Sequence, residues 1–539
     1  MSLSKHIDPE SLVEEHMRRR SALGTTVKKP LKHVASPYLS RYTAIEPAPR
    51  FAAYQIIRDD LDLDGKPNLN LASFVGTYIE AESERLSLEN LTKNLADNDE
   101  YPAMMDIHSR CITILGNLWH ASPTTTGSSE AIHLGGLAMK RRWQEKRRAE
   151  GKDASQPNIL MGANAQVALE KFARYFDVES RLIPVCKESN HCIDPTKILD
   201  QIDENTIGIF IILGSTYTGH YEPVEHISKI LDEFQARTGL DIPIHVDAAS
   251  GGFVAPFSHP NTVWDFRLSR VHSINTSGHK YGLVTAGLGW IIWRSEDYLP
   301  KHLVFELKYL GGVEQSFTLN FSRPGHQVIQ QYYNFLHLGR DGYSRIQNNS
   351  LANARLLSDV LEESGLFVCL SEIHRPKGIH SMLSDNEVKA ELGDDPELYN
   401  AGLPVVSWKF TDQILENYPH VKQANMSTLL RVKGYIIPNY PLPSDEADTE
   451  ILRVVVRESM TADLLSKLCE DIIGIAESLI NADPNMQSPS HPLNAVQSMT
   501  TLSRRATSLG SLSEHASQLN LSDVPKQRSH KHGHYKGVC

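Results

Sequence analysis

Lys280 closes the run Ser277-Gly278-His279-Lys280, in which it follows a small residue and a histidine. A lysine that forms a Schiff base must lose its proton and reach a carbonyl group. The glycine leaves room for a bound molecule, and His279 offers it a polar contact. Because most lysines are solvated surface groups, the run alone is a weak signal. It marks Lys280 as a candidate for covalent chemistry.

A carboxylate ends an apolar segment in a second run, His245-Val246-Asp247-Ala248-Ala249. Electron-sink chemistry on a pyridine ring needs a protonated ring nitrogen, and a carboxylate beside that nitrogen keeps the proton there. The two alanines let a ring lie close to the backbone. A lone aspartate at the end of a strand is more often a helix cap. Its pairing with Lys280, 33 residues later, favours the chemical role.

Small and hydroxyl residues gather in a third run, Gly127-Ser128-Ser129-Glu130-Ala131, just before a helical pattern. The N-terminus of a helix presents free N–H groups to an anion, and the serines add hydroxyl donors. Alternatively, Ser128 or Ser129 is only a helix N-cap. A phosphate cradle, a partner for a ring nitrogen and a Schiff-base lysine occur here in a workable order. Together the three runs indicate pyridoxal 5′-phosphate as the cofactor.

Six distinctive stretches lie between about residues 69 and 457: TYTG (216–219), HVDAASGGFVAPF (245–257), WDFR (264–267), SGHKYG (277–282), YLGG (309–312) and NFSRP (320–324). In these stretches the chain resembles glutamate decarboxylase of the bacterial, plant and fungal type. The resemblance implies conversion of L-glutamate to 4-aminobutanoate and carbon dioxide. It implies a Schiff base on Lys280, with Asp247 on the pyridinium nitrogen. It also implies a homodimer or a larger homo-oligomer, with a hexamer as one option.

The same resemblance implies which residues contact the cofactor: Ser128, Ser129, Gln166, Thr216, Asp247, Ala249, Ser277, His279, Lys280 and Ser322. Within this set, Gln166 matches a residue stacked on the ring, and Ala249 would lie on the opposite face. Ser322 matches a phosphate contact donated by the neighbouring subunit. Thr216 matches a polar contact beside the cofactor and the substrate carboxylate.

Substrate contacts follow from the resemblance in the same way. Arg453 matches the arginine that grips the α-carboxylate region, and Ser73, Phe74 and Asp97 match the pocket for the distal carboxylate. The family usually has threonine at the position of Ser73, so a methyl group is lost and the hydroxyl is kept. Tyr309 lies in an expected mobile loop that could close the site and exclude water. Tyr309 and Lys280 are both candidates for the proton donor.

Two alternatives stay open, and a departure from the family pattern supports the first of them. Only Ser122–Thr126 separate Trp119-His120-Ala121 from Gly127, where the family usually carries a longer loop. A protein that keeps the fold but has lost catalysis would be consistent with this shortening. A different pyridoxal-phosphate reaction is the other alternative, since the cofactor motifs tolerate several reactions.

Alternating helical and strand-like segments must position these residues. Apolar runs predict strands over 206–213 and 243–246, and helical spacing predicts helices over 224–237 and 134–148. Such alternation favours an α/β fold with a mostly parallel sheet between helices. The resemblance makes this pyridoxal-phosphate fold type I, with a seven-stranded sheet in a large domain.

The domain organisation follows from shifts in composition. We expect an N-terminal arm over 1–65, the large cofactor-binding domain over 66–344, a small α+β domain over 345–480 and a disordered tail over 481–539. In the small domain, helices are predicted over 350–364 and 461–480, and strands over 405–410 and 451–456. Ser503–Ser508 in the tail resembles a kinase site, and calmodulin binding by the tail is the less favoured alternative.

Composition excludes several other classes of protein. The net charge of −11 argues against a nucleic-acid partner, and no run approaches the roughly 18 apolar residues of a membrane span. Six scattered cysteines predict no disulfide framework. Cys186, His191 and Cys192 raise the question of a metal, but they lack a second ligand cluster, so no metal is expected. The prediction is a cytoplasmic enzyme.

Overall fold

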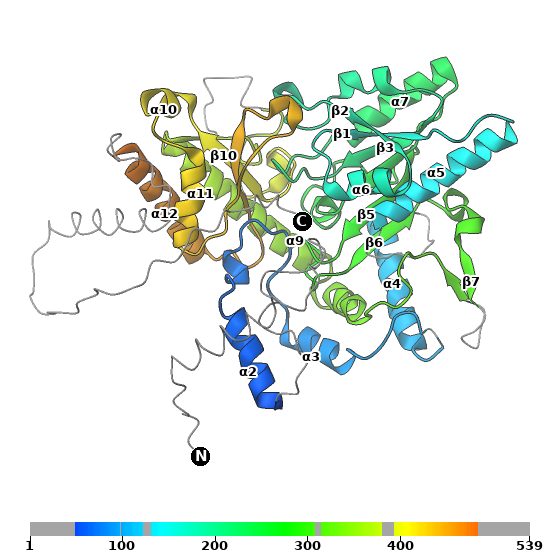
Figure 1. Cartoon of the computed structure of the whole chain (residues 1–539), viewed down its shortest axis with the longest axis horizontal. Helices are drawn as coiled ribbons and strands as arrows, with labels where there is room; N and C mark the ends of the chain where they lie inside the picture. The colour runs from blue at the N-terminus through cyan, green and yellow to red at the C-terminus, as the bar shows by residue number, and fades with distance from the viewer. Residues whose placement is uncertain (1–48, 98, 122–130, 308–313, 380–392, 483–539) are drawn as a thin grey trace, which may run out of the picture. The chain divides into compact units, whose positions relative to one another are not determined.

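The computed structural model describes residues 49–97, 99–121, 131–307, 314–379, 393–482 of the chain (Figure 1). Two compact units divide the chain, residues 1–64 and 65–539. The first contains helix α2 (Arg50–Leu61), which has no buried residue. Most of the expected arm, and the expected tail beyond residue 482, lie outside the described residues.

A six-stranded sheet forms the centre of the second unit, in the order β2-β1-β3-β4-β5-β6. Its strands are β1 (Asn158–Gly162), β2 (Glu179–Ile183), β3 (Thr206–Ile212), β4 (Ile244–Asp247), β5 (Val271–Ser277) and β6 (Gly289–Trp293). All neighbouring strands are parallel except β5 and β6. The mostly parallel sheet is therefore confirmed. Seven strands were expected, but β7 (Phe305–Leu307) and β8 (Glu314–Ser316) pair only with each other, so the described residues give this sheet six.

Helices cover both faces of this sheet, as predicted. The helices that follow the strands or precede them are α4 (Pro102–Leu118), α5 (Ala131–Ala149), α6 (Val167–Tyr175), α7 (Val224–Thr238) and α8 (Ala255–Ser258). Met161 of β1 packs in one core with Phe172 of α6. Leu160, its neighbour on β1, packs in another core with Leu115 of α4 and Ile227 of α7. Because successive strand residues point to opposite faces, the two cores lie on opposite sides of the sheet.

A four-stranded antiparallel sheet, in the order β11-β12-β10-β9, lies in the C-terminal part of the chain. Its strands are β9 (Phe367–Cys369), β10 (Val405–Phe410), β11 (Asn439–Pro441) and β12 (Glu450–Val455). Both strands predicted in this region, and the closing helix, are confirmed as β10, β12 and α12. The associated helices are α9 (His326–Glu363), α10 (Asp412–Asn417), α11 (Gln423–Val432) and α12 (Ala462–Ile480). The helix predicted over 350–364 is the second part of the longer α9, which bends at Gly339. The boundary at 344 stays a prediction, since α9 runs through it.

The segment from residue 67 to 78 lies against the end of β12 and precedes α3 (Ala81–Glu89). Leu71 O accepts a hydrogen bond from Val455 N at 2.8 Å. Arg457 donates to the carbonyls of Pro67, Asn70 and Val75, and its side chain is buried. This bonding fixes a stretch of irregular chain that carries two of the predicted substrate residues. None of the helices in the described parts of the chain is long and apolar enough to cross a membrane.

Candidate active site

Asp247 and Lys280 follow neighbouring strands of the large sheet. Asp247 is the last residue of β4, and Lys280 comes three residues after the end of β5. Since β4 and β5 are parallel, their carboxyl ends meet at one edge of the sheet, where ligands of α/β proteins bind. Both side chains are buried, and Lys280 Nζ donates to Ser250 Oγ at 3.3 Å. The sequence-based assignment had not singled out Ser250, although it stands inside the HVDAASGG stretch.

The carboxylate of Asp247 is held by two N–H donors on one oxygen. Its Oδ1 accepts from Ala249 N at 3.1 Å and from Asn275 Nδ2 at 2.9 Å. Ala249 O in turn accepts from Ser277 N at 3.1 Å. The predicted cofactor residues Asp247, Ala249 and Ser277 therefore lie together at the ends of β4 and β5.

Phe74 links Lys280 to Arg453. The centre of its ring lies 5.2 Å from Lys280 Nζ and 5.1 Å from the guanidinium carbon of Arg453. Both distances are within the range of a cation–π interaction. The ring is 3% exposed, so it shields this side of the two cations from water. The residue expected to bind the cofactor covalently and the arginine expected to grip a carboxylate thus meet on one aromatic ring.

Arg453 is held by two backbone carbonyls, and its Nε–H is left without a partner in the described parts of the chain. It donates through Nη1 to Thr216 O at 2.8 Å and through Nη2 to Ala72 O. Its Nε is buried and has no hydrogen-bond partner among the described residues. A buried N–H without a partner is costly, which favours a site that an anionic ligand completes. Ser73 and Phe74 directly follow Ala72, and Gln166 donates to the hydroxyl of Thr216.

His279 lies beside the lysine and is held as a neutral ring. Its Nδ1 donates to Leu288 O at 2.8 Å. Burial lowers the pKa of His279, and the charge of Lys280 lowers that pKa further. A neutral imidazole with a proton on Nδ1 leaves Nε2 as an acceptor. His279 O also accepts from Gly76 N at 3.3 Å, which joins the lysine turn to the segment that carries Ser73 and Phe74.

A second cluster brings Asp97 and Ser322 together through Asn94. The amide nitrogen of Asn94 donates to Asp97 Oδ1 at 3.1 Å and to Ser322 Oγ at 3.3 Å. Asn94 Oδ1 accepts from Arg323 N at 2.9 Å, and Leu95 N donates to Arg323 O at 2.8 Å. Sequence reasoning had grouped Asp97 with Ser73 and Phe74. The hydrogen bonds described for Asp97 lead to Ser322, the residue predicted to act on the neighbouring subunit.

Three predicted site residues, Ser128, Ser129 and Tyr309, lie outside the described residues, as does the short loop 122–126. The phosphate cradle therefore stays a prediction. Helix α5 begins at Ala131, two residues after Ser129, which is consistent with an anion site at its N-terminus.

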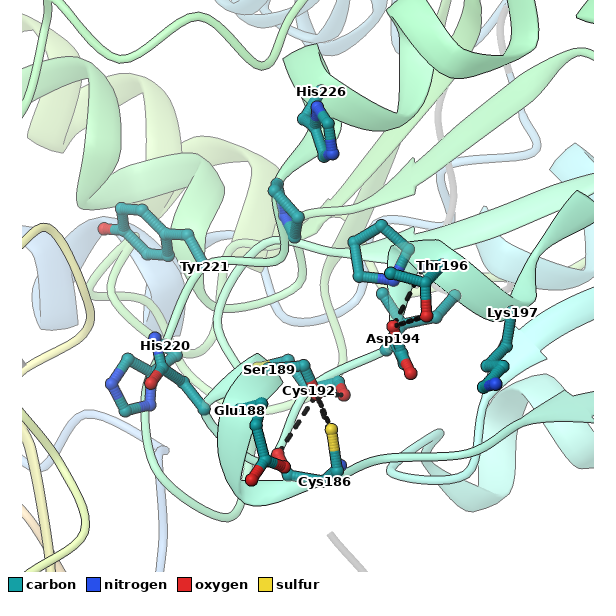
Figure 2. A pocket seen from close by; sticks show the side chains of 14 residues that line it. Cys186, Glu188, Ser189, Cys192, Asp194, Thr196, Lys197, His220, Tyr221 and His226 are labelled. Carbon is teal, nitrogen blue, oxygen red and sulfur yellow. Dashed lines mark hydrogen bonds between the residues drawn. The ribbon is translucent and has the colours of Figure 1, made fainter. Parts of the chain in front are cut away.

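A separate pocket of about 630 Å³ lies among the segments that follow β2 and β3 (Figure 2). Cys186 and Cys192 line it, together with His220 and His226, and it contains none of the predicted cofactor or substrate residues. Cys186 Sγ lies 3.4 Å from a serine hydroxyl, and His191 Nδ1 lies 2.6 Å from Glu446 Oε2. In the described parts of the chain, no three His, Cys, Asp or Glu residues are grouped as metal ligands.

Comparison with known proteins decides which family this arrangement represents. The pattern of the pyridoxal-dependent decarboxylase conserved domain matches residues 72–377. The chain belongs to the pyridoxal-dependent decarboxylase family. It is 50% identical over 460 residues to glutamate decarboxylase of Saccharomyces cerevisiae, covering 80% of this chain and 78% of that protein. It is 42% identical over 466 residues to glutamate decarboxylase 5 of Arabidopsis thaliana, covering 83% and 88%.

Solved structures of relatives agree with the fold of this pyridoxal-dependent decarboxylase. Glutamate decarboxylase of Lactobacillus brevis superposes with a TM-score of 0.72 at 38% identity, covering 82% of this chain and 95% of that one. Tryptophan decarboxylase of Catharanthus roseus superposes with a TM-score of 0.62 at 16% identity, covering 88% and 100%. The second comparison shows the shared fold alone.

Pyridoxal 5′-phosphate is the cofactor of the family and of this decarboxylase. The described residues fit that group. A buried amine on Lys280 stands beside the edge of the sheet where the Asp247 carboxylate is held. Arg453, whose Nε has no partner among these residues, contacts the same Phe74 ring as Lys280. The carboxylate of Asp247 suits a protonated pyridine nitrogen, the guanidinium of Arg453 suits the carboxylate of an amino acid, and the Phe74 ring gives both an apolar wall.

Proposed function

We propose that the chain decarboxylates L-glutamate to 4-aminobutanoate and carbon dioxide. The observation that carries the proposal is that Lys280 and Arg453 both contact one buried ring, that of Phe74. The relatives that are 42–50% identical to the chain are glutamate decarboxylases, which supports the same substrate.

When bound, pyridoxal 5′-phosphate supplies an electron sink for the bond pair left by the departing carboxylate. Lys280 would anchor the cofactor aldehyde covalently and give way to the substrate amine. Ser250 accepts a hydrogen bond from Lys280 Nζ and so orients the amine. Asp247 would hold the proton on the ring nitrogen, with its orientation set by Ala249 and Asn275.

Arg453 would orient the α-carboxylate region of the substrate. The bond that breaks must lie perpendicular to the plane of the electron sink, so the main task of the pocket is orientation. Backbone carbonyls of Thr216 and Ala72 fix the guanidinium, which then presents Nε without having to reorganise. Phe74 excludes water from this side of the site.

The distal carboxylate of glutamate would contact Ser73 of the same subunit and Asp97 of a neighbouring subunit, while Ser322 of that neighbour would contact the cofactor phosphate. Asp97 and Ser322 are joined by the Asn94 amide, so they must act together. If Ser322 reaches the cofactor of the neighbouring subunit, Asp97 must reach into that same site. The proposed assembly is therefore an obligate homodimer or a larger homo-oligomer, in which each site is built from two chains.

A substrate panel tests the proposal. Purified protein with pyridoxal phosphate is given L-glutamate, L-aspartate, L-glutamine or L-tryptophan, and carbon dioxide and the amine product are measured. We expect equimolar 4-aminobutanoate and carbon dioxide from L-glutamate alone. Decarboxylation of another amino acid in place of glutamate would contradict the substrate. Absence of turnover with the cofactor bound would favour a non-catalytic relative.

A pair of arginine variants tests the role of Arg453. Arg453→Gln should lower kcat/KM for glutamate by about tenfold to a hundredfold, because hydrogen bonds to a charged partner are lost. Arg355→Gln is the matched control, since Arg355 is also buried and lies 4.2 Å from the Tyr399 ring. Its kcat/KM should stay near that of the parent protein. Equal losses in both variants would assign the effect to packing.

A further inference from the structure

Four buried polar side chains on β4 and β5 form a hydrogen-bonded row that ends at Asp247. Ser273 Oγ lies 2.7 Å from His245 Nδ1, and His245 Nε2 lies 2.7 Å from Asn275 Oδ1. Asn275 Nδ2 then donates to Asp247 Oδ1 at 2.9 Å. The strand register places His245 opposite Ser273 and Asp247 opposite Asn275. Because alternate strand residues share a face, all four side chains lie on one side of the sheet, and none is more than 2% exposed.

The donor and the acceptor of each hydrogen bond in this row follow from the Asp247 carboxylate, which can only accept. Asn275 donates its amide N–H to the carboxylate of Asp247, so its carbonyl oxygen faces His245 and must accept. Burial lowers the pKa of His245, which keeps the ring neutral with a single N–H. That proton must therefore sit on Nε2. Nδ1 is then an acceptor, and Ser273 donates its hydroxyl to it.

Packing holds the imidazole of His245 in place. The ring of Phe210, on β3, meets it edge to face at 5.2 Å between centres. On the side of α5, a Cβ added at Gly135 would lie 2.6 Å from His245 Cε1, so only glycine lets the helix approach this closely. The histidine is thus confined between a strand and the helix that begins just after the predicted phosphate cradle. It has little freedom to turn away from Asn275.

We propose that His245 and Asn275 are positioning residues for Asp247, which orient its carboxylate toward the ring nitrogen of pyridoxal phosphate. This inference rests on the proposed function of Asp247. Among the described residues, both hydrogen bonds accepted by the Asp247 side chain fall on Oδ1, which leaves Oδ2 for the ring N–H. Without the donor on His245, the side-chain amide of Asn275 is free to rotate so that its oxygen and nitrogen exchange places. Its oxygen would then face Asp247 Oδ1, and two acceptors would repel each other.

Cofactor affinity and the state of the ring nitrogen test the inference without any substrate. His245→Leu and Asn275→Ala should each weaken binding of pyridoxal phosphate by about tenfold or more. Asn275→Ala removes a hydrogen bond to the Asp247 carboxylate, and His245→Leu removes the donor that keeps the Asn275 amide oriented for that bond. With ¹⁵N-labelled cofactor, the nitrogen resonance of both variants should move toward the unprotonated position. His245→Gln retains an amide donor and should recover part of the affinity. In turnover, the loss should appear in kcat more than in KM.

His259→Leu is the matched control, since His259 is also a buried histidine but packs against Tyr221, outside this chain of hydrogen bonds. It should melt at a lower temperature without a change in cofactor affinity or in the nitrogen resonance. The inference would be overturned if Asn275→Ala bound pyridoxal phosphate with parental affinity and left the nitrogen resonance of the cofactor unmoved. If His245→Leu does not fold, Asn275→Ala decides alone. Because glutamate is absent, these readouts stay valid even if the parent protein does not decarboxylate glutamate.

Discussion

The guanidinium carbon of Arg453 lies 5.1 Å from the centre of the Phe74 ring, although the two residues are 379 positions apart in the chain. The ring also lies 5.2 Å from Lys280 Nζ. The segment that carries Phe74 is held against β12 by hydrogen bonds from Arg453 and Arg457 to its carbonyl groups. The large sheet and the C-terminal sheet therefore both contribute to one site, and this segment joins their contributions.

Replacement of Phe74 tests whether that ring matters beyond its volume. Phe74→Leu should lower kcat/KM for glutamate by about tenfold, because the desolvated cation–π contact with Arg453 is worth roughly 0.5–2 kcal/mol and is lost. Phe410→Leu is the control, since Phe410 is fully buried in the C-terminal core. Steady-state kinetics and thermal melts of both variants are compared. Similar kinetics for the two variants would show that the ring is only a core residue.

Mixed dimers test whether the Asn94–Asp97–Ser322 cluster acts on the neighbouring subunit. Chains with Lys280→Ala and chains with Asp97→Ala should each be nearly inactive alone. A mixed dimer holds one site with both substitutions and one with neither, so about half of its sites should be active. Two different affinity tags allow isolation of the mixed species. If Asp97 served its own subunit, each site would carry one substitution and no activity would return.

The pH dependence of stability should carry the signature of buried neutral histidines. Burial lowers the pKa of His259 to about 4, whereas the unfolded value is about 6.5. The unfolded chain binds the proton first as pH falls, so stability is full above pH about 6.5 and is lost toward pH about 4. The slope from this group is at most about 1.4 kcal/mol per pH unit.

Urea unfolding of the parent protein and of His259→Phe, across that pH range, measures this contribution. The free energy of unfolding of the variant should fall less steeply with acid than that of the parent. Parallel curves would mean that His259 is protonated in the folded protein as well. Other buried histidines, such as His272, remain in both proteins and cancel in the comparison.

Periodicity in the sequence was enough to predict much of the fold. The apolar run of β3 and the helical spacing of α7 lie within one or two residues of the predicted bounds, since both are long and strongly patterned. The sequence did not predict that β7 and β8 pair only with each other, because strand pairing depends on contacts between distant segments. Motif order likewise placed Asp247 and Lys280 together, since two adjacent parallel strands end there.

Other contacts of the site could not be read from the sequence. Asn94 carries no motif, and its link to Ser322 spans 228 positions. The role of Asn275 depends on the register between β4 and β5, which composition does not determine. Asp97 was assigned by resemblance to the pocket of Ser73 and Phe74. That assignment stays a prediction, and the link from Asp97 through Asn94 to Ser322 is visible only in the folded chain.

Quantification of 4-aminobutanoate by chromatography, after incubation of L-glutamate with the cofactor-loaded protein, tests the central claim most directly. Parent protein should form the product continuously. Lys280→Ala should form none above the background while it stays folded, because no amine remains to anchor the cofactor and release the product. Product formation by Lys280→Ala at the parental rate, or its absence with the loaded parent protein, would contradict the account.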